Sequence, residues 1–210
     1  MSDDAEFDEL PAFEPLQVKC NDSDCESGKH AFAPNRRKKN WEKSYEGQCR
    51  DCGAKLVDWD RLKQRDLKDV QGVFGELRHE LIRHVFFHAP FDEASKTEAK
   101  ALGPAGLKAK VRSHLMKKVA PEKIWRDGTQ TPKKDSAIHF AQHATATCCR
   151  KCMEYWHAIP RGRDLTPAEL EYCEALACAY LDLRAPALFD DLGKPPSIGP
   201  LGGEPDYEES

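Results

Sequence analysis

The sequence has neither a long apolar run nor the motifs of the common enzyme classes. No stretch of about eighteen consecutive apolar residues occurs in the 210 residues, so we expect no membrane-spanning helix. The first ten residues, MSDDAEFDEL, carry acids where a secretion signal needs basic residues and an apolar run, so we expect a cytoplasmic protein. A Walker loop, a dinucleotide-binding glycine pattern, a Gly-x-Ser-x-Gly elbow and the zinc deaminase signature are all missing.

Apolar residues are only moderately frequent, and charge is unevenly distributed. Hydrophobic residues make up 40% of the chain and charged residues 32%, which permits a core of modest size that metal sites could reinforce. Residues 1–18 contain six acids and no Lys or Arg, and residues 185–210 contain six acids and one Lys. The segment between them has 31 bases against 24 acids. We therefore expect a basic body that could bind nucleic acid, and acidic ends that could contact protein partners.

Cysteine, in contrast, is abundant, with nine residues in the chain. In a reducing compartment they are expected to bind metal or remain free thiols rather than form disulfides. Cys173 and Cys178 lie in a helical pattern without a neighbouring cysteine, which favours buried free thiols. The other seven are clustered at spacings typical of metal ligands.

The first cluster combines Cys20 and Cys25 with the Cys49-x-x-Cys52-Gly53 knuckle. Two cysteine pairs joined by a loop are typical of a zinc ribbon, so the sequence predicts one zinc ion held by these four thiolates. Gly53 would supply the positive backbone dihedral that such a knuckle often needs. His30 lies in the loop between the pairs, and we expect it to be solvated rather than a ligand.

The second cluster lies within residues 142–163. Its possible ligands are His143, Cys148, Cys149, Cys152 and His157. Cys149 and Cys152 form a Cys-x-x-Cys, and His157 follows after four residues, a spacing typical of small zinc knuckles. The fourth ligand could be His143, Cys148 or a residue from elsewhere, and the sequence leaves open which of Cys148 and Cys149 binds. Two zinc ions are thus expected in all; an iron–sulfur cluster at the second site is the alternative.

Two groups of basic residues accompany these clusters. Arg36, Arg37, Lys38 and Lys39 lie between the first two cysteine pairs, and Arg150, Lys151, Arg161 and Arg163 surround the second site. They favour a zinc-binding protein that associates with nucleic acid, although each group could equally be a solvated surface. One alternative is a nuclease-like metal-dependent hydrolase with an open coordination position at His143, Cys149, Cys152 and His157. The other is a protein-interaction scaffold.

The predicted fold is mainly α with a small β zinc ribbon, an α+β class. Residues 1–16 are expected to be a disordered lead, 17–58 the ribbon, 59–184 a helical domain and 185–210 a disordered tail. Helical periodicity covers residues 60–88, where Gly72 and Gly75 are expected to divide or bend the helix. Further helices are predicted over 92–102 and 104–119, an extended segment over 136–147, and a capped helix from Thr166 to about Arg184.

Several strings in the second half resemble a known family. These are DGTQTP from Asp127, QHATATCCRKC from Gln142, and WHAIPRGRDLT from Trp156. They are similar to a bacterial family of uncharacterised small proteins, a domain of unknown function, over about residues 127–182. The strings CRDCGAKLVDWDR and IRHVFFH in the first half resemble a longer branch of this group that carries a ribbon. The resemblance implies a shared fold and metal site but no established reaction.

Overall fold

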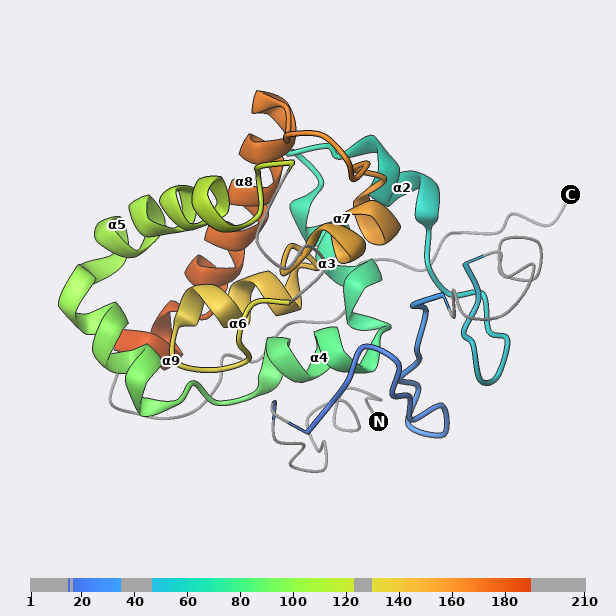
Figure 1. Cartoon of the computed structure of the whole chain (residues 1–210). Helices are drawn as coiled ribbons and strands as arrows, with labels where there is room; N and C mark the ends of the chain where they lie inside the picture. Colours follow the sequence, from blue (N-terminus) through green and yellow to red (C-terminus); the bar gives the residue numbers. More distant parts are fainter. Residues whose placement is uncertain (1–14, 16, 35–46, 123–129, 190–210) are drawn as a thin grey trace, which may run out of the picture.

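The computed structural model describes residues 15, 17–34, 47–122 and 130–189. Over these ranges the chain is mainly helical (Figure 1). The helices are α2 (Trp59–Gln64), α3 (Val70–Arg78), α4 (Leu81–His88), α5 (Glu93–Lys118), α6 (Ala137–Ala144), α7 (Arg150–His157), α8 (Pro167–Leu183) and α9 (Ala185–Phe189). The helical body is therefore confirmed, and α9 lies in the range that we expected to be tail.

The predicted β zinc ribbon is wrong. In the described ranges, β pairing is limited to two isolated bridges, Asp24 with Lys29 and His30 with Glu80. Asp24 and Lys29 exchange two backbone hydrogen bonds of 2.8 Å across a tight turn in which Gly28 has a φ of 67°. The chain near Cys25 and Cys49 thus forms compact turns instead of the extended strands that a ribbon requires.

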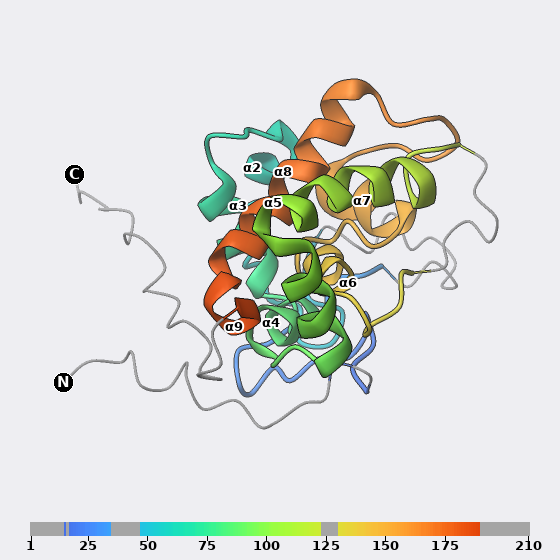
Figure 2. The ribbon, with the colours of Figure 1, turned by 90° about the vertical axis from the view of Figure 1, so that its left-hand side faces the viewer.

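Helices α4 and α6 form the centre of the body. Every residue from Leu81 to Phe87 in α4 is buried, and α6 is buried along almost its whole length. α4 packs on α6, while α5 and α8 pack on each other and on α6 from the outside. Figures 1 and 2 show α6 between α4 and the α5–α8 pair from two directions.

The extended segment predicted over residues 136–147 is wrong, because α6 occupies most of it. The Ser136 hydroxyl caps this helix by accepting a hydrogen bond from the Ile138 N–H at 3.3 Å. Small side chains such as Ala137 and Ala141 allow close approach to the neighbouring helices. The sequence of this segment shows little helical periodicity, and the helix is stabilised instead by packing against its neighbours.

Other helix boundaries were partly predictable. The Thr166 capping box and Pro at the start of α8 are confirmed, and so is the break at Gly103, where φ is 65°. The division at Gly72 and Gly75 is wrong, because both glycines lie inside α3. The chain breaks on either side of α3 instead, at residues 65–69 and 79–80.

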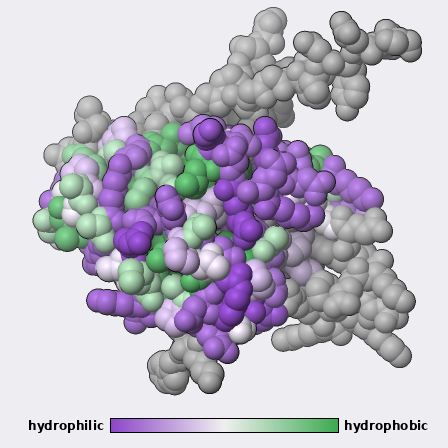
Figure 3. Space-filling model, turned by 90° about the horizontal axis from the view of Figure 1, so that it is seen from above, coloured by the Kyte–Doolittle hydropathy of each residue, from purple (hydrophilic) through white to green (hydrophobic). Residues whose placement is uncertain are grey.

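The N-terminal segment is attached to the helical body by its backbone. The His30 N–H donates to the His79 carbonyl, and the Leu81 N–H donates to the His30 carbonyl, both at 2.9 Å. Residue 30 is thereby fixed at the start of α4. Viewed from above, the surface is largely hydrophilic with small apolar patches between (Figure 3). None of the helices described is long and apolar enough to cross a membrane.

Candidate metal centres

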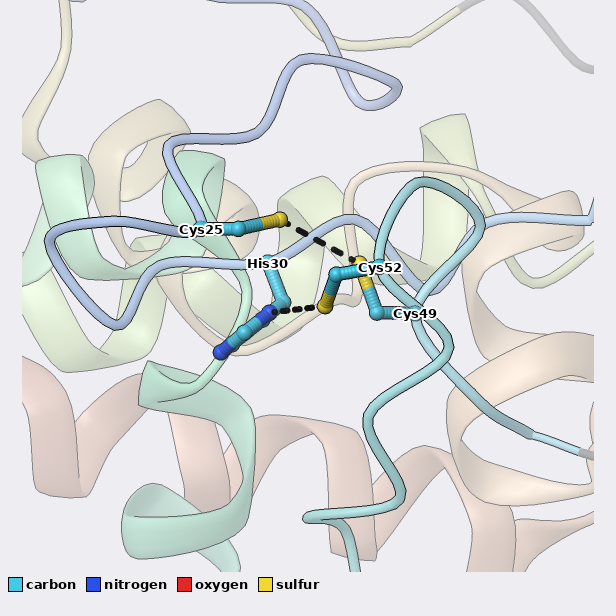
Figure 4. A group of neighbouring side chains, drawn as sticks. All are labelled: Cys25, His30, Cys49 and Cys52. Atoms are coloured by element: carbon cyan, nitrogen blue, oxygen red, sulfur yellow. Dashed lines mark hydrogen bonds between the residues drawn. The ribbon is translucent and has the colours of Figure 1, made fainter.

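The first candidate centre contains Cys25, His30, Cys49 and Cys52. One possible ligand atom of each residue lies within 4.8 Å of the others. Figure 4 shows that the side chains come from two loops, one carrying Cys25 and His30 and the other carrying Cys49 and Cys52. His30 and Cys49 are buried, whereas Cys52 is exposed, so the centre lies at the edge of the body.

The spacing of these atoms is that of ligands around one ion. Cys25 Sγ lies 3.8 Å from Cys49 Sγ, and Cys52 Sγ lies 3.3 Å from His30 Nδ1. Tetrahedral zinc, with Zn–S near 2.3 Å and Zn–N near 2.0 Å, places two sulfurs about 3.8 Å apart and a sulfur and a nitrogen about 3.5 Å apart. The four side chains could therefore hold a metal ion with little rearrangement.

Backbone turns prepare the Cys49–Cys52 knuckle for this role. The Gly53 N–H donates to the Cys49 carbonyl and the Cys49 N–H donates to the Ala54 carbonyl, at 2.9 and 2.8 Å. Gly53 has a φ of 79°, which confirms the positive dihedral predicted there. The Ser23 hydroxyl also donates to the Asp51 carboxylate at 2.7 Å, which joins the two loops.

Cys20, predicted as a ligand of this first centre, lies elsewhere, and His30 occupies its place. The tight turn between Asp24 and Lys29 brings Cys25 and His30 to the same side of the chain. The spacing Cys25-x4-His30 equals the Cys152-x4-His157 spacing that we used to predict the second site. That signal was present at both places, and only at the first does the structure bring the cysteine and histidine together.

The second candidate centre contains Cys148, Cys149 and Cys152, all of them buried. Their sulfur atoms lie within 4.8 Å of one another. Cys149 is the residue before α7, and Cys152 is in the first turn of that helix. The hydrogen bond with Cys148, together with burial, raises the pKa of the Cys149 thiol. The three cysteines could also hold a metal ion.

A buried arginine that the sequence did not single out points at these thiols. Arg83 Nη2 lies 3.3 Å from Cys152 Sγ, and Nη1 lies 4.0 Å from Cys148 Sγ. Its Nε is paired with the Glu80 carboxylate at 2.9 Å, and both side chains are fully buried. Burial raises the pKa of Glu80 to about 7. Arg83 is therefore a partner of the thiols, and Glu80 is a buried partner of Arg83.

Cys20 approaches this second group. Its thiol is in hydrogen-bonding contact with Cys152, and its sulfur accepts a hydrogen bond of 2.6 Å from the Gln130 amide. The hydrogen bond with Cys152, together with the charge of Arg83, lowers the pKa of Cys20 to about 5 despite its burial. A lowered pKa favours the thiolate, which is the form of cysteine that binds metal.

The two histidines predicted at this site are not part of the cysteine group. His143 Nε2 bonds the Thr131 carbonyl at 2.9 Å, and the ring stacks on Phe86 with centroids 4.7 Å apart. His157 Nε2 bonds the Thr145 carbonyl at 2.9 Å, and its Nδ1 bonds the Tyr172 hydroxyl at 3.1 Å. Burial lowers the pKa of His143 to about 3 and that of His157 to about 4. Both rings therefore serve as neutral core hydrogen-bonding groups.

The polar residues before the cysteines hold the turn between α6 and α7. The Gln142 amide donates to the Thr147 carbonyl at 3.3 Å, and the Thr147 N–H donates back to the Gln142 carbonyl at 2.9 Å. The hydroxyls of Thr145 and Thr147 lie 3.0 Å apart. Ala146 between them has a φ of 55°. These bonds explain the polar character of this segment without a catalytic role.

The basic residues predicted to contact nucleic acid have varied positions. Arg150 is buried and donates to four backbone carbonyls, those of Val119, Ala120, Pro160 and Arg163. Arg161 pairs with Glu154 at 2.9 Å, and Arg163 pairs with Glu169 at 2.6 Å. Lys151 is exposed. Arg36, Arg37, Lys38 and Lys39 lie outside the described residues.

Comparison with known proteins places the chain in a family. No solved structure matches it significantly. Residues 71–182, just over half of the 210 residues, match the model of a domain of unknown function, DUF4186. The match includes Arg83 and the three cysteines of the second centre, whereas the first centre and Cys20 precede it. The chain therefore belongs to the DUF4186 family of proteins of unknown function.

Proposed function

We propose that this protein is a zinc-stabilised scaffold in which two zinc ions are structural. The observation that carries the proposal is the closed ligand set of the first centre, Cys25, His30, Cys49 and Cys52. Four protein ligands fill a tetrahedral ion, which leaves no position for substrate or a reactive water. Zinc is the metal best suited to a tetrahedral set of thiolates and imidazole.

The proposed role is to attach the N-terminal segment to the helical domain. An ion in the first centre would join the loop with Cys25 and His30 to the loop with Cys49 and Cys52, across a stretch of more than twenty residues. Closing a loop of that length by a metal ion reduces the entropy of the unfolded chain. Structural zinc also contributes its binding free energy to folding directly.

A hydrolase is not part of the proposal. The predicted catalytic site required His143 and His157 at the metal, whereas their ring nitrogens bond Thr131, Thr145 and Tyr172. A nucleic-acid partner is not part of it either. Arg150 is buried and donates to backbone carbonyls, while Arg161 and Arg163 pair with carboxylates of the protein itself. These contacts remove the main described support for a basic surface.

Metal analysis of the full chain, purified with a reductant, tests the proposal. We expect about two zinc ions per chain and no visible absorbance. His30→Ala should lose one of the two ions, whereas the control His139→Ala should retain both, because His139 bonds only a backbone carbonyl through Nδ1. A wild-type chain without metal, or a His30→Ala variant that binds two ions as tightly as wild type, would overturn the proposal.

A further inference from the structure

We infer that Cys20 completes the second centre, so that Cys20, Cys148, Cys149 and Cys152 bind one thiophilic divalent cation as a four-thiolate site. This inference deepens the proposed function and rests on it. It assigns Cys20 to a different ion from Cys25, although the two cysteines are only five positions apart. It also means that a segment outside the family match supplies the last ligand to a site within it.

The first argument is position. Cys148, Cys149 and Cys152 already form a compact group, and the Cys20 thiol contacts this group through Cys152. Two interactions hold the Cys20 segment there. Gln130 donates to Cys20 Sγ at 2.6 Å, and the Lys133 ammonium donates to the Val18 carbonyl. A surface cysteine of a solvated loop would have no need of such anchors.

The second argument is charge. Four thiolates and one divalent ion carry a net charge of minus two, which is costly to bury without nearby cations. Arg83 donates to Cys152 and Cys148. Lys133 interacts electrostatically with Cys20 and Cys148. The two bases offset part of this charge, since Arg83 is also paired with Glu80, and hydrogen bonds to thiolate sulfur are a usual feature of such sites.

The third argument concerns the kind of metal group. The sulfur atoms of Cys148, Cys149 and Cys152 lie within 4.8 Å of one another, a spacing that suits a single ion. A four-iron cluster binds its thiolates at the corners of a larger polyhedron and holds them farther apart. A mononuclear tetrahedral sulfur site favours zinc, for which cobalt is a spectroscopic probe.

Paired cysteine substitutions separate this assignment from the four-cysteine ribbon. We expect Cys20→Ser to lower metal affinity at one site by more than about 100-fold, the upper range for loss of a mere supporting contact. Under challenge with a chelator, the double variant Cys20→Ser/Cys152→Ser should keep one zinc ion, because both changes affect the same site. Cys20→Ser/Cys25→Ser should keep none. Cys173→Ser, which removes a buried thiol outside both groups, should keep both ions.

The opposite pattern would overturn the inference: one ion kept by Cys20→Ser/Cys25→Ser and none by Cys20→Ser/Cys152→Ser. So would a Cys20→Ser variant with two ions of wild-type affinity. If a double variant fails to fold, cobalt spectra of wild type and of Cys20→Ser decide, because ligand-field bands move to shorter wavelength when a thiolate is lost. An unchanged long-wavelength band in Cys20→Ser contradicts the assignment. A wild-type chain that binds no metal would instead contradict the proposed function, and this result is distinct from those above.

Discussion

Some buried polar side chains in the described part of the chain bond neighbouring groups through two of their atoms. His157 illustrates this point, since it donates to the Thr145 carbonyl and accepts from the Tyr172 hydroxyl. The neutral imidazole with its proton on Nε2 fits both bonds, because the carbonyl accepts and the tyrosine hydroxyl can donate. In the sequence, the spacing of His157 from Cys152 suggested a zinc ligand instead.

The pH dependence of stability tests the role of His157. Burial lowers its folded-state pKa from 6.5 to about 4, so the unfolded chain binds more protons between these values. The stability contributed by the neutral ring is complete above pH 6.5 and is lost as the pH falls through about 4, by up to about 3 kcal/mol. Urea unfolding from pH 7 to 4.5 should show a shallower decline for His157→Gln, whose amide can keep both bonds without titrating.

Zinc content must be followed in the same samples, because acid also releases metal from thiolates. The comparison is made between wild type and variant at equal zinc content. Identical pH slopes for the two proteins would contradict a neutral His157 in the folded state.

The residue types in the sequence predicted the kind of site, but they did not predict which residues belong to each ligand set. Thiol spacing alone indicated two metal sites, and the seven clustered cysteines lie in or next to two groups that could hold a metal ion. Spacing could not show which cysteines share a group, because Cys25 belongs to the first group and Cys20, only five residues away, does not. The role of Arg83 could not be predicted either, since nothing in its local sequence indicates a contact with a thiol 65 residues later.

At the scale of elements, the loops near the first centre depend on their contact with α2. Trp59, the first residue of α2, donates from its indole Nε1 to the Gly47 carbonyl at 2.9 Å. Its ring also lies 5.0 Å, between centroids, from both Tyr155 and Trp156 of α7. This aromatic group connects the Cys49 knuckle to the helix that carries Cys152.

Gly47 is the position where this contact is most sensitive. It has a φ of 71°, and an added Cβ would lie 2.2 Å from Trp59 Nε1. We predict that Gly47→Ala lowers the free energy of unfolding by about 2–4 kcal/mol, from backbone strain and overpacking together. Gly28→Ala is the matched control, because Gly28 has a φ of 67° but nothing within 4 Å of the added atom. Equal losses for the two variants, in urea unfolding, would show that the Trp59 contact has no importance.

Helix prediction succeeded where local chemistry decides and failed where packing decides. The capping box at Thr166 and the break at Gly103 are local signals, and both were found. α6 carries no such strong signal apart from Ser136, and it is helical because it fills the space between α4 and α8. The ribbon prediction was wrong because it inferred strands from cysteine spacing. The spacing indicates metal ligands, but the chain around them forms turns instead of strands.

In the whole molecule, the two centres are linked by a short series of contacts. His30 of the first centre is bridged by backbone pairing to Glu80, and Glu80 is ion-paired with Arg83. Arg83 in turn donates to Cys152 of the second centre. Metal bound at the two sites would therefore fix both ends of one buried connection through the start of α4, which is the centre of the body.

Thermal unfolding with and without metal tests the central claim most directly. The full chain, kept reduced, is melted before and after exhaustive chelation, and again after zinc is restored. Loss of two structural ions should cost at least several kcal/mol, which for a chain of this size lowers the Tm by about 10 °C or more. We predict that fall and its recovery with zinc; a Tm that does not change after all metal has been removed would contradict the account.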